Sequence, residues 1–334
     1  FCYRQFIATP DKLIDVRLAM RLIDQAAELG VPSIKFNWRG EPLLNPKLPE
    51  LIAYAKKQGI LETIINTNAT NLDDACAKAL IDAGLDLIIY SFDGGSKESY
   101  ERMRPGRFKE NSFDHVYNNI RRFAQIKEEM QSPFPRTMIQ MILTEQTFSE
   151  QDEFFRLFGD CVDYVAVKQY TERGGKLSEL DEKTRDAVEV GLQSHALSED
   201  APFFRDRNGE LSVGVGRLAC EQPYQRLLVA YDGRVGMCCY DWGAKHPVGF
   251  ADGLAIKLGE SEYIKIIDKA RAGTKGFGGL QKVTQPLRFN QPPEVVQELA
   301  DIWFGAEIDA VRSAHVEGHV DQVEICRKCP FKET

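Results

Sequence analysis

Ser33-Ile34-Lys35-Phe36-Asn37-Trp38-Arg39-Gly40-Glu41-Pro42 is a short strand-like run that passes into a polar loop, and amphipathic helical patterns flank it on both sides. Further strand-like runs occupy residues 62–66, 87–92, 136–143 and 162–167, with helical patterns between them. Strands that alternate with helices of this length predict βαβ units and a parallel sheet. We therefore expect an α/β fold, an open or closed barrel whose chemistry lies on the loops at the carboxyl ends of its strands.

The composition of the chain excludes several classes of protein. Its 334 residues are 43% hydrophobic and 28% charged, which is enough to bury a large core in one or two domains. A net charge of −8 argues against an enzyme that holds nucleic acid through phosphate contacts. No apolar run reaches the roughly 18 residues of a transmembrane helix, so we expect no membrane partner. Because the chain starts at Phe1 rather than Met, we expect residues upstream of it, and no signal peptide can be judged.

Polar side chains follow three successive strand-like runs. Glu41 lies in the loop quoted above, Thr67 and Asn68 follow the next run, and Ser91 and Asp93 follow the third. The carboxyl ends of parallel strands meet at one edge of a sheet, so we expect these side chains to lie at the mouth of the barrel. Three of them also have a simpler interpretation. Glu41 before Pro42 would cap a helix that begins near Asn45. Asn68 would cap the following helix, as would Thr70 or Asn71, and Asp93-Gly94 is typical of a turn.

Four of the eight cysteines form a second pattern, Cys220-x12-Gly233-x4-Cys238 followed by Cys326-x2-Cys329. Asp232-Gly233 is a strong hairpin signal, and a hairpin returns the second cysteine towards the first. Eight cysteines are too few for a disulfide scaffold, and this spacing favours metal ligation in a reducing cytoplasm. Four thiolates hold either one iron–sulfur cluster or one zinc ion.

The remaining cysteines and histidines carry weaker signals. Cys239 adjoins Cys238, and the spacing favours Cys238 as the ligand. Cys76 and Cys161 lie in apolar periodic surroundings and are predicted to be core thiols. None of the five histidines has a catalytic pairing; His315 and His319 are four residues apart, and a solvated helix end is favoured over a metal pair there.

The order of the strand-end loops resembles the radical S-adenosylmethionine (SAM) superfamily. Members of that family carry a CxxxCxΦC loop whose three cysteines bind a four-iron cluster. Phe1-Cys2 matches its last two positions, so the other two cysteines would lie immediately upstream. The family's Gly-Gly-Glu motif matches Arg39-Gly40-Glu41 with one departure, Arg39 in place of the first glycine. The resemblance covers about residues 1–170 and implies a partial (β/α)6 TIM-like barrel.

The same resemblance implies a SAM site at the mouth of that barrel. One iron of the cluster would be open to the amino and carboxylate groups of SAM, and an electron from the cluster would release a 5′-deoxyadenosyl radical. Glu41 is expected to accept a charge-assisted hydrogen bond from the amino group, and Asn68 and Ser91 to bind ribose hydroxyls. The cofactor-binding residues implied in this way are Gly40, Glu41, Thr67, Asn68, Ser91 and Asp93, with Cys2 as a ligand of the cluster.

The cysteine quartet resembles the twitch domain, the shortened form of the SPASM domain. In that family, four such cysteines fully ligate an auxiliary four-iron cluster, which suits electron transfer; zinc remains the alternative. A full SPASM domain has a further cysteine that would fall just beyond Thr334, so the sequence leaves open whether a second auxiliary cluster is present. We expect a barrel at 1–170, a connecting segment at 171–215 and a small α+β cysteine-ligated cluster domain at 216–334.

The two resemblances together imply a cytoplasmic radical SAM oxidoreductase that dehydrogenates a sugar-like or other small alcohol. The auxiliary cluster would be the electron acceptor, and flavodoxin or ferredoxin the reductant. One alternative is a peptide-modifying radical SAM enzyme that crosslinks or epimerises its substrate. Another is a non-enzymatic interaction protein that binds zinc or a cluster. The candidate substrate contacts at strand ends and beside the cysteines are Arg39, Gln140, Lys168, Tyr170, Arg173 and Asp241.

Overall fold

The structure is a computed structural model that describes residues 12–38, 40–104, 112–144, 147–169, 203–205, 211–213, 219–241, 244, 246–253, 296–327 and 329. The chain divides into two compact units, which are described separately below. One unit is Ala19–Tyr170, and the other joins Phe1–Leu18 to Thr171–Thr334. Within the described residues, every helix is too short or too polar to cross a lipid bilayer.

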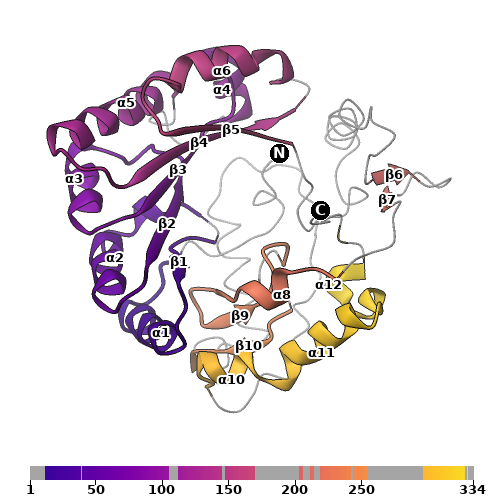
Figure 1. The fold of residues 1–334 in the computed structure, drawn as a ribbon. Coiled ribbons are helices and arrows are strands. Elements are labelled where there is room, and N and C mark those ends of the chain that lie inside the picture. The colour runs from indigo at the N-terminus through magenta and orange to yellow at the C-terminus, as the bar shows by residue number, and fades with distance from the viewer. Residues whose placement is uncertain are drawn as a thin grey trace, which may run out of the picture. The chain divides into compact units, whose positions relative to one another are not determined.

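The first unit is built on one parallel sheet of five strands in the order β1-β2-β3-β4-β5, with helices along its outer side (Figure 1). The strands are β1 (Ser33–Lys35), β2 (Glu62–Thr67), β3 (Leu87–Ser91), β4 (Arg136–Leu143) and β5 (Tyr164–Gln169). The accompanying helices are α1 (Val16–Glu28), η2 (Pro42–Leu44), α2 (Leu48–Lys57), α3 (Asp74–Asp82), α4 (Lys97–Met103), α5 (Phe113–Glu129), η4 (Phe148–Glu150) and α6 (Gln151–Phe158). The predicted parallel α/β sheet is confirmed, while closure to six strands stays a prediction.

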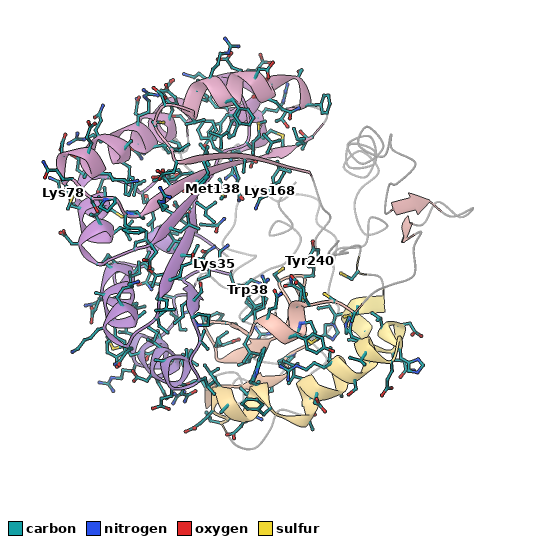
Figure 2. The ribbon with its side chains drawn as sticks, viewed as in Figure 1. Lys35, Trp38, Lys78, Met138, Lys168 and Tyr240 are labelled. Atoms are coloured by element: carbon teal, nitrogen blue, oxygen red, sulfur yellow. The ribbon has the colours of Figure 1, made fainter. Side chains whose placement is uncertain are left out.

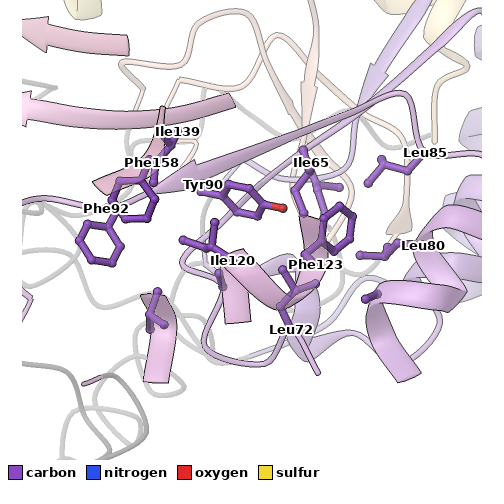
Figure 3. Packing of buried hydrophobic residues seen from close by; sticks show 14 of the residues in the cluster. Ile65, Leu72, Leu80, Leu85, Tyr90, Phe92, Ile120, Phe123, Ile139 and Phe158 are labelled. Atoms are coloured by element: carbon purple, nitrogen blue, oxygen red, sulfur yellow. The ribbon is translucent and has the colours of Figure 1, made fainter. Parts of the chain in front are cut away.

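The hydrophobic core lies between this sheet and its helices (Figure 3). Burial alternates along β2 and β4, because successive side chains of a strand point to opposite faces. Phe92, which directly follows β3, is fully buried; its ring stacks on Tyr100 at 4.1 Å between centroids and meets Phe158 edge-on at 4.8 Å. The aromatic cluster therefore anchors the backbone just before the predicted site residue Asp93.

The core thiols predicted from the sequence are confirmed. Cys76 and Cys161 are partly buried and pack against the core cluster. Burial raises the pKa of each thiol to about 11, so neither is a reactive thiolate at neutral pH.

Two aspartates, here called the aspartate clamps, each join the amino ends of two adjacent strands, Asp86 those of β2 and β3 and Asp163 those of β4 and β5. Asp86 Oδ2 accepts hydrogen bonds from the backbone N and Oγ1 of Thr63, at 2.8 and 2.9 Å, and pairs with Lys56. Asp163 Oδ2 accepts the same two bonds from Thr137, at 2.7 and 2.9 Å, and pairs with Lys127 at 3.1 Å. Because both threonines are buried, a shift of the strand pairing by one residue would leave their hydrogen-bond donors unsatisfied. The clamps therefore help to set the strand register on which the opposite, site-bearing edge depends.

In the second unit, the described part mixes short strands with helices. A three-stranded antiparallel sheet has the order β10-β9-β8, and a separate two-stranded sheet pairs β6 with β7. The strands are β6 (Phe203–Arg205), β7 (Leu211–Val213), β8 (Leu228–Val229), β9 (Arg234–Gly236) and β10 (Gly249–Phe250). The helices are α8 (Gln222–Gln225), α10 (Leu299–Trp303), α11 (Ala306–Val316), η6 (Val320–Gln322) and α12 (Glu324–Arg327).

The hairpin predicted between the first two cysteines of the quartet is confirmed, because β8 pairs with β9 across Asp232-Gly233. Gly233 has a φ of +84°, and a Cβ there would lie 2.3 Å from the Cβ of Asp252, so only glycine fits the turn. Arg234 and Asp232 form a buried ion pair at 2.9 Å beside this turn. The pair holds the hairpin end in one conformation.

Candidate functional site

Glu41 joins the loops that follow β1 and β2. Its Oε1 accepts hydrogen bonds from Thr67 Oγ1 at 2.6 Å and from the backbone N of Leu43 at 3.1 Å. Its Oε2 accepts one from the backbone N of Asn68 at 2.8 Å. Burial raises the pKa of Glu41 above its ordinary value, although the hydrogen bonds from Asn68, Thr67 and Leu43 oppose that effect. The structure thus brings together three of the residues that the sequence placed at the barrel mouth.

The expected cap of a helix beginning near Asn45 is wrong, because α2 begins at Leu48 with Lys47 at its N-cap, but the side chain of Glu41 does cap the short helix η2. The two roles are compatible, because a carboxylate has about four acceptor positions and only three are occupied by these contacts. One position on Oε2 remains for a further donor. Gly40, directly before Glu41, has a φ of +86° that favours glycine. Arg39 lies outside the described residues.

The loop after β2 is held in a turn by its own polar atoms. Asn68 Oδ1 accepts a hydrogen bond from the backbone N of Thr70 at 2.9 Å, and Thr67 Oγ1 accepts one from the N of Ala69 at 2.9 Å. Asn119 of α5 donates to the carbonyl of Ala69 at 2.9 Å. The interpretation of Asn68 as a cap of the next helix is wrong, because Asp73 caps α3 through the backbone N of Cys76.

Asp93 acts first as a structural group at the end of β3. Its side chain is 1% exposed, and it forms an ion pair with Arg104 at 2.6 Å. Asp93 Oδ1 accepts a hydrogen bond from the backbone N of Ile142 at 2.9 Å. Oδ1 thus holds the β3 loop against β4, Oδ2 holds it to Arg104 at the end of α4, and a cofactor contact of Asp93 stays a prediction.

The inner face of the sheet, opposite its helices, carries polar side chains. Figure 2 shows Lys35, Met138 and Lys168 on this face, away from Lys78 on the helical side. Ser91 on β3 pairs in register with Gln140 on β4, and Gln140 Nε2 donates to Ser91 Oγ at 3.3 Å.

Two buried side-chain oxygens lie on this face of the sheet. Asn66 Oδ1 and Gln140 Oε1 are buried and have no hydrogen-bond partner among the described residues. Leaving a buried acceptor unsatisfied costs about 1–3 kcal/mol. Hydroxyl or amino donors, such as those of a nucleoside or a polyhydroxylated molecule, would satisfy both atoms. Two other candidate contacts, Tyr170 and Arg173, lie outside the described residues.

Glu150 joins η4 to the loop after β3, a contact that the sequence patterns did not single out. From η4 it accepts hydrogen bonds from the backbone N of Gly95 at 2.7 Å, Ser96 Oγ at 2.9 Å and Ser99 Oγ at 2.5 Å. A Cβ on Gly95 would lie 2.5 Å from the carbonyl oxygen of Glu150, so the approach needs glycine. The only signal in the sequence was the Gly-Gly-Ser run after β3, which does not indicate which distant residue contacts it.

The stability that Glu150 provides is expected to depend on pH. Burial raises the pKa of Glu150, but hydrogen bonds from Ser99, Gly95 and Ser96 outweigh burial and hold it below its ordinary value. Its stabilising effect is therefore complete above the unfolded pKa of about 4.3 and is lost as the pH falls through the folded pKa. We expect Glu150→Gln to lower the melting temperature near neutral pH and by progressively less below about pH 4.3. Scanning fluorimetry across pH, with the exposed Glu128→Gln as control, would contradict this if the deficit grew on acidification.

In the second unit, Cys238 and Cys220 of the quartet each lie near another cysteine. The thiols of Cys238 and Cys239 share a hydrogen bond, and Cys329 is near enough to interact electrostatically with Cys238. The hydrogen bond with Cys239, together with burial, raises the pKa of the Cys238 thiol far above its ordinary value. Metal ligation must therefore displace thiol protons. Cys220 also interacts electrostatically with Cys239, so the choice between Cys238 and its neighbour stays open.

Among the described residues, no three His, Cys, Asp or Glu side chains converge as a metal site, so shared ligation by the quartet stays a prediction. The donor set itself fits an iron–sulfur cluster or zinc, since all four groups are thiols that become good ligands when deprotonated. Asp241, predicted as a substrate contact, is buried and accepts a hydrogen bond from the backbone N of His246 at 2.9 Å. Cys2 lies outside the described residues.

The fold and the polar strand ends agree with a family match. Residues 1–158 match the model of the radical SAM superfamily. The chain therefore carries a radical SAM domain, and the cofactors of such a domain are a four-iron cluster and SAM.

Individual relatives cover only part of this chain. GTP 3',8-cyclase of Chlorobaculum tepidum is 34% identical over 111 residues, 33% of this chain and 33% of that protein. PqqA peptide cyclase of Granulibacter bethesdensis is 42% identical over 84 residues, 25% of this chain and 22% of that protein. The chain thus spans a third or less of these curated relatives. The structure of Streptococcus suis SuiB bound to its precursor peptide SuiA aligns over 92% of this chain and 62% of that chain, with 14% identity and a TM-score of 0.54, a likeness of fold alone.

Proposed function

We propose that this protein is a radical SAM oxidoreductase that removes two hydrogens from a small hydroxylated substrate. The observation that carries the proposal is the Glu41 network at the edge of the sheet, within the region that matches the radical SAM model. When bound, the SAM-binding cluster and SAM supply a 5′-deoxyadenosyl radical at the cost of one electron from a reductant such as flavodoxin or ferredoxin.

The residues of the chain then bind and orient SAM and the substrate. The open acceptor position on Glu41 Oε2 takes an N–H of the SAM amino group, and the hydrogen bonds from Thr67 to Oε1 and from Asn68 to Oε2 keep the carboxylate in place. Asn68 and Ser91 at the two adjacent strand ends offer polar groups to ribose hydroxyls. On the inner face, Gln140 and Asn66 supply acceptors for donors of SAM or the substrate.

Oxidation of an alcohol needs an acceptor for one further electron. The substrate loses a hydrogen atom to the radical, then a proton and an electron, and a carbon–oxygen double bond forms. A cluster ligated by Cys220, Cys238, Cys326 and Cys329 is the proposed acceptor of that electron. A fully ligated cluster has no iron open to substrate, so these four residues serve electron transfer alone.

A peptide is the second candidate substrate. It is supported by the 42% identity with PqqA peptide cyclase over 84 residues and by the likeness of fold to SuiB in complex with SuiA. In that case the same residues would bind SAM, and the substrate radical would lead to a crosslink or an epimer instead of a carbonyl.

The test is anaerobic reconstitution of the complete gene product, with iron, sulfide and zinc counted. Incubation with SAM and a reductant is expected to release 5′-deoxyadenosine, and with the substrate a product two hydrogens lighter by mass spectrometry. Zinc without iron, or no 5′-deoxyadenosine with any candidate alcohol or peptide, would contradict the proposal and favour an interaction protein. A peptide product of unchanged mass would indicate epimerisation.

A further inference from the structure

His315 connects two cysteines of the quartet that are far apart in the sequence. Its side chain is buried, with 5% exposed, near the end of α11. Its Nδ1 lies 3.1 Å from the backbone N of Cys220, and its Nε2 lies 3.5 Å from Sγ of Cys326. The expectation that His315 is part of a solvated helix end is therefore wrong.

The partners of the ring determine which nitrogen carries the proton. A backbone N–H only donates, so Nδ1 of His315 accepts the bond from Cys220 with its lone pair. The neutral ring must then carry its hydrogen on Nε2, the nitrogen that faces Cys326. A nitrogen that holds a hydrogen does not bind a metal, so His315 is a hydrogen-bond donor to the thiol group and not a fifth ligand.

The segment that carries Cys220 is tied to α11 at two more points. Tyr224 donates from its hydroxyl to the carbonyl of Arg312 at 2.8 Å. Arg312 in turn donates from Nε to the carbonyl of Pro223 at 3.0 Å. These bonds lie one helical turn before His315, so the position of its ring relative to Cys220 does not depend on a single contact.

We propose that His315 is a positioning residue of the auxiliary cluster, which donates Nε2–H to the Cys326 thiolate and raises the reduction potential of the cluster. This inference rests on the proposed function, because it requires a cluster at the quartet. A hydrogen bond to a ligating sulfur favours the reduced, more negatively charged cluster, and that is the state which an electron acceptor must reach. The same bond restrains Cys326 relative to Cys220.

The test uses two amide variants that separate the two nitrogens. In His315→Asn, the amide oxygen takes the place of Nδ1 and keeps the acceptor for Cys220, while the donor to Cys326 is lost. In His315→Gln, the amide nitrogen reaches the place of Nε2 and keeps the donor. The matched control is His319→Gln, since His319 is exposed.

The readout is the midpoint potential of the auxiliary cluster in the complete, reconstituted protein with SAM bound, followed by electron paramagnetic resonance. We expect His315→Asn to lower the equilibrium constant for reduction about tenfold, a shift of about 59 mV to more negative potential for a one-electron couple. His315→Gln and the control should stay near the wild type.

The possible failures are distinguishable. If the wild type holds no second cluster, the proposed electron acceptor and this inference both fall. If the second cluster is present and His315→Asn leaves its potential unchanged, only the inference is wrong. Equal shifts in the Asn and Gln variants would assign His315 a packing role alone. If the Asn variant does not fold, a shifted potential in a Gln variant with full cluster content would by itself overturn the inference.

Discussion

Changing both cysteines of the C-terminal pair, Cys326→Ala with Cys329→Ala, is expected to abolish product formation while SAM cleavage continues. The iron content should fall from about eight to about four per chain, because two of four thiolates cannot hold an auxiliary cluster. Without that acceptor the substrate radical cannot lose its second electron. Release of 5′-deoxyadenosine should therefore persist but become uncoupled from product.

The measurement is iron and sulfide content together with the ratio of product to 5′-deoxyadenosine. The matched control is Cys76→Ala with Cys161→Ala, which removes two thiols from the core of the other unit. That control should keep its iron content and its ratio of product to 5′-deoxyadenosine. It should lose some stability, because each removed thiol leaves a space in the core. Full iron content in the Cys326/Cys329 variant would show that the pair binds no cluster.

The second large effect is expected from Glu41→Gln, which should weaken SAM binding by about tenfold to a hundredfold, as for the loss of one charge-assisted hydrogen bond. The amide oxygen of Gln still accepts from Thr67 and Leu43, whereas its NH2 group faces the backbone N–H of Asn68. Two donors then oppose each other, and the position open to the SAM amino group is lost with the charge.

Calorimetric titration of the reconstituted protein with SAM measures this effect. Glu50→Gln is a suitable control, because Glu50 forms an exposed pair with Lys47 on α2. The melting temperature of the Glu41 variant should also fall, since a buried donor loses its partner. Unchanged SAM affinity would show that Glu41 serves only to join the two loops and cap η2.

The parts of the fold that follow from local patterns were predictable. Four of the five strands of the parallel sheet have a short apolar run, and the hairpin at Gly233 requires a backbone conformation that glycine favours. The meeting of Glu41 with Thr67 and Asn68 was also predictable, because parallel strands bring successive loops to one edge.

The parts that depend on contacts between distant segments were not predictable. Glu150 reaches the loop after β3 from η4, and no spacing in the sequence links the two. His315 appeared as one of two histidines four residues apart, yet α11 ends before His319 and only His315 is buried. A helical repeat shows which residues share a face, but it does not show what packs against that face.

The two aspartate clamps have a consequence for where the sheet opens locally. Asp86 and Asp163 accept hydrogen bonds from the backbone amides of Thr63 and Thr137 at the amino ends of β2 and β4. These amide protons should therefore exchange with solvent only when the whole unit unfolds. The loops at the opposite edge lie beyond the hydrogen bonds between strands and should open more often. We therefore expect local opening mainly at the edge where ligands are proposed to bind, so that binding would leave the alignment of the strands unchanged.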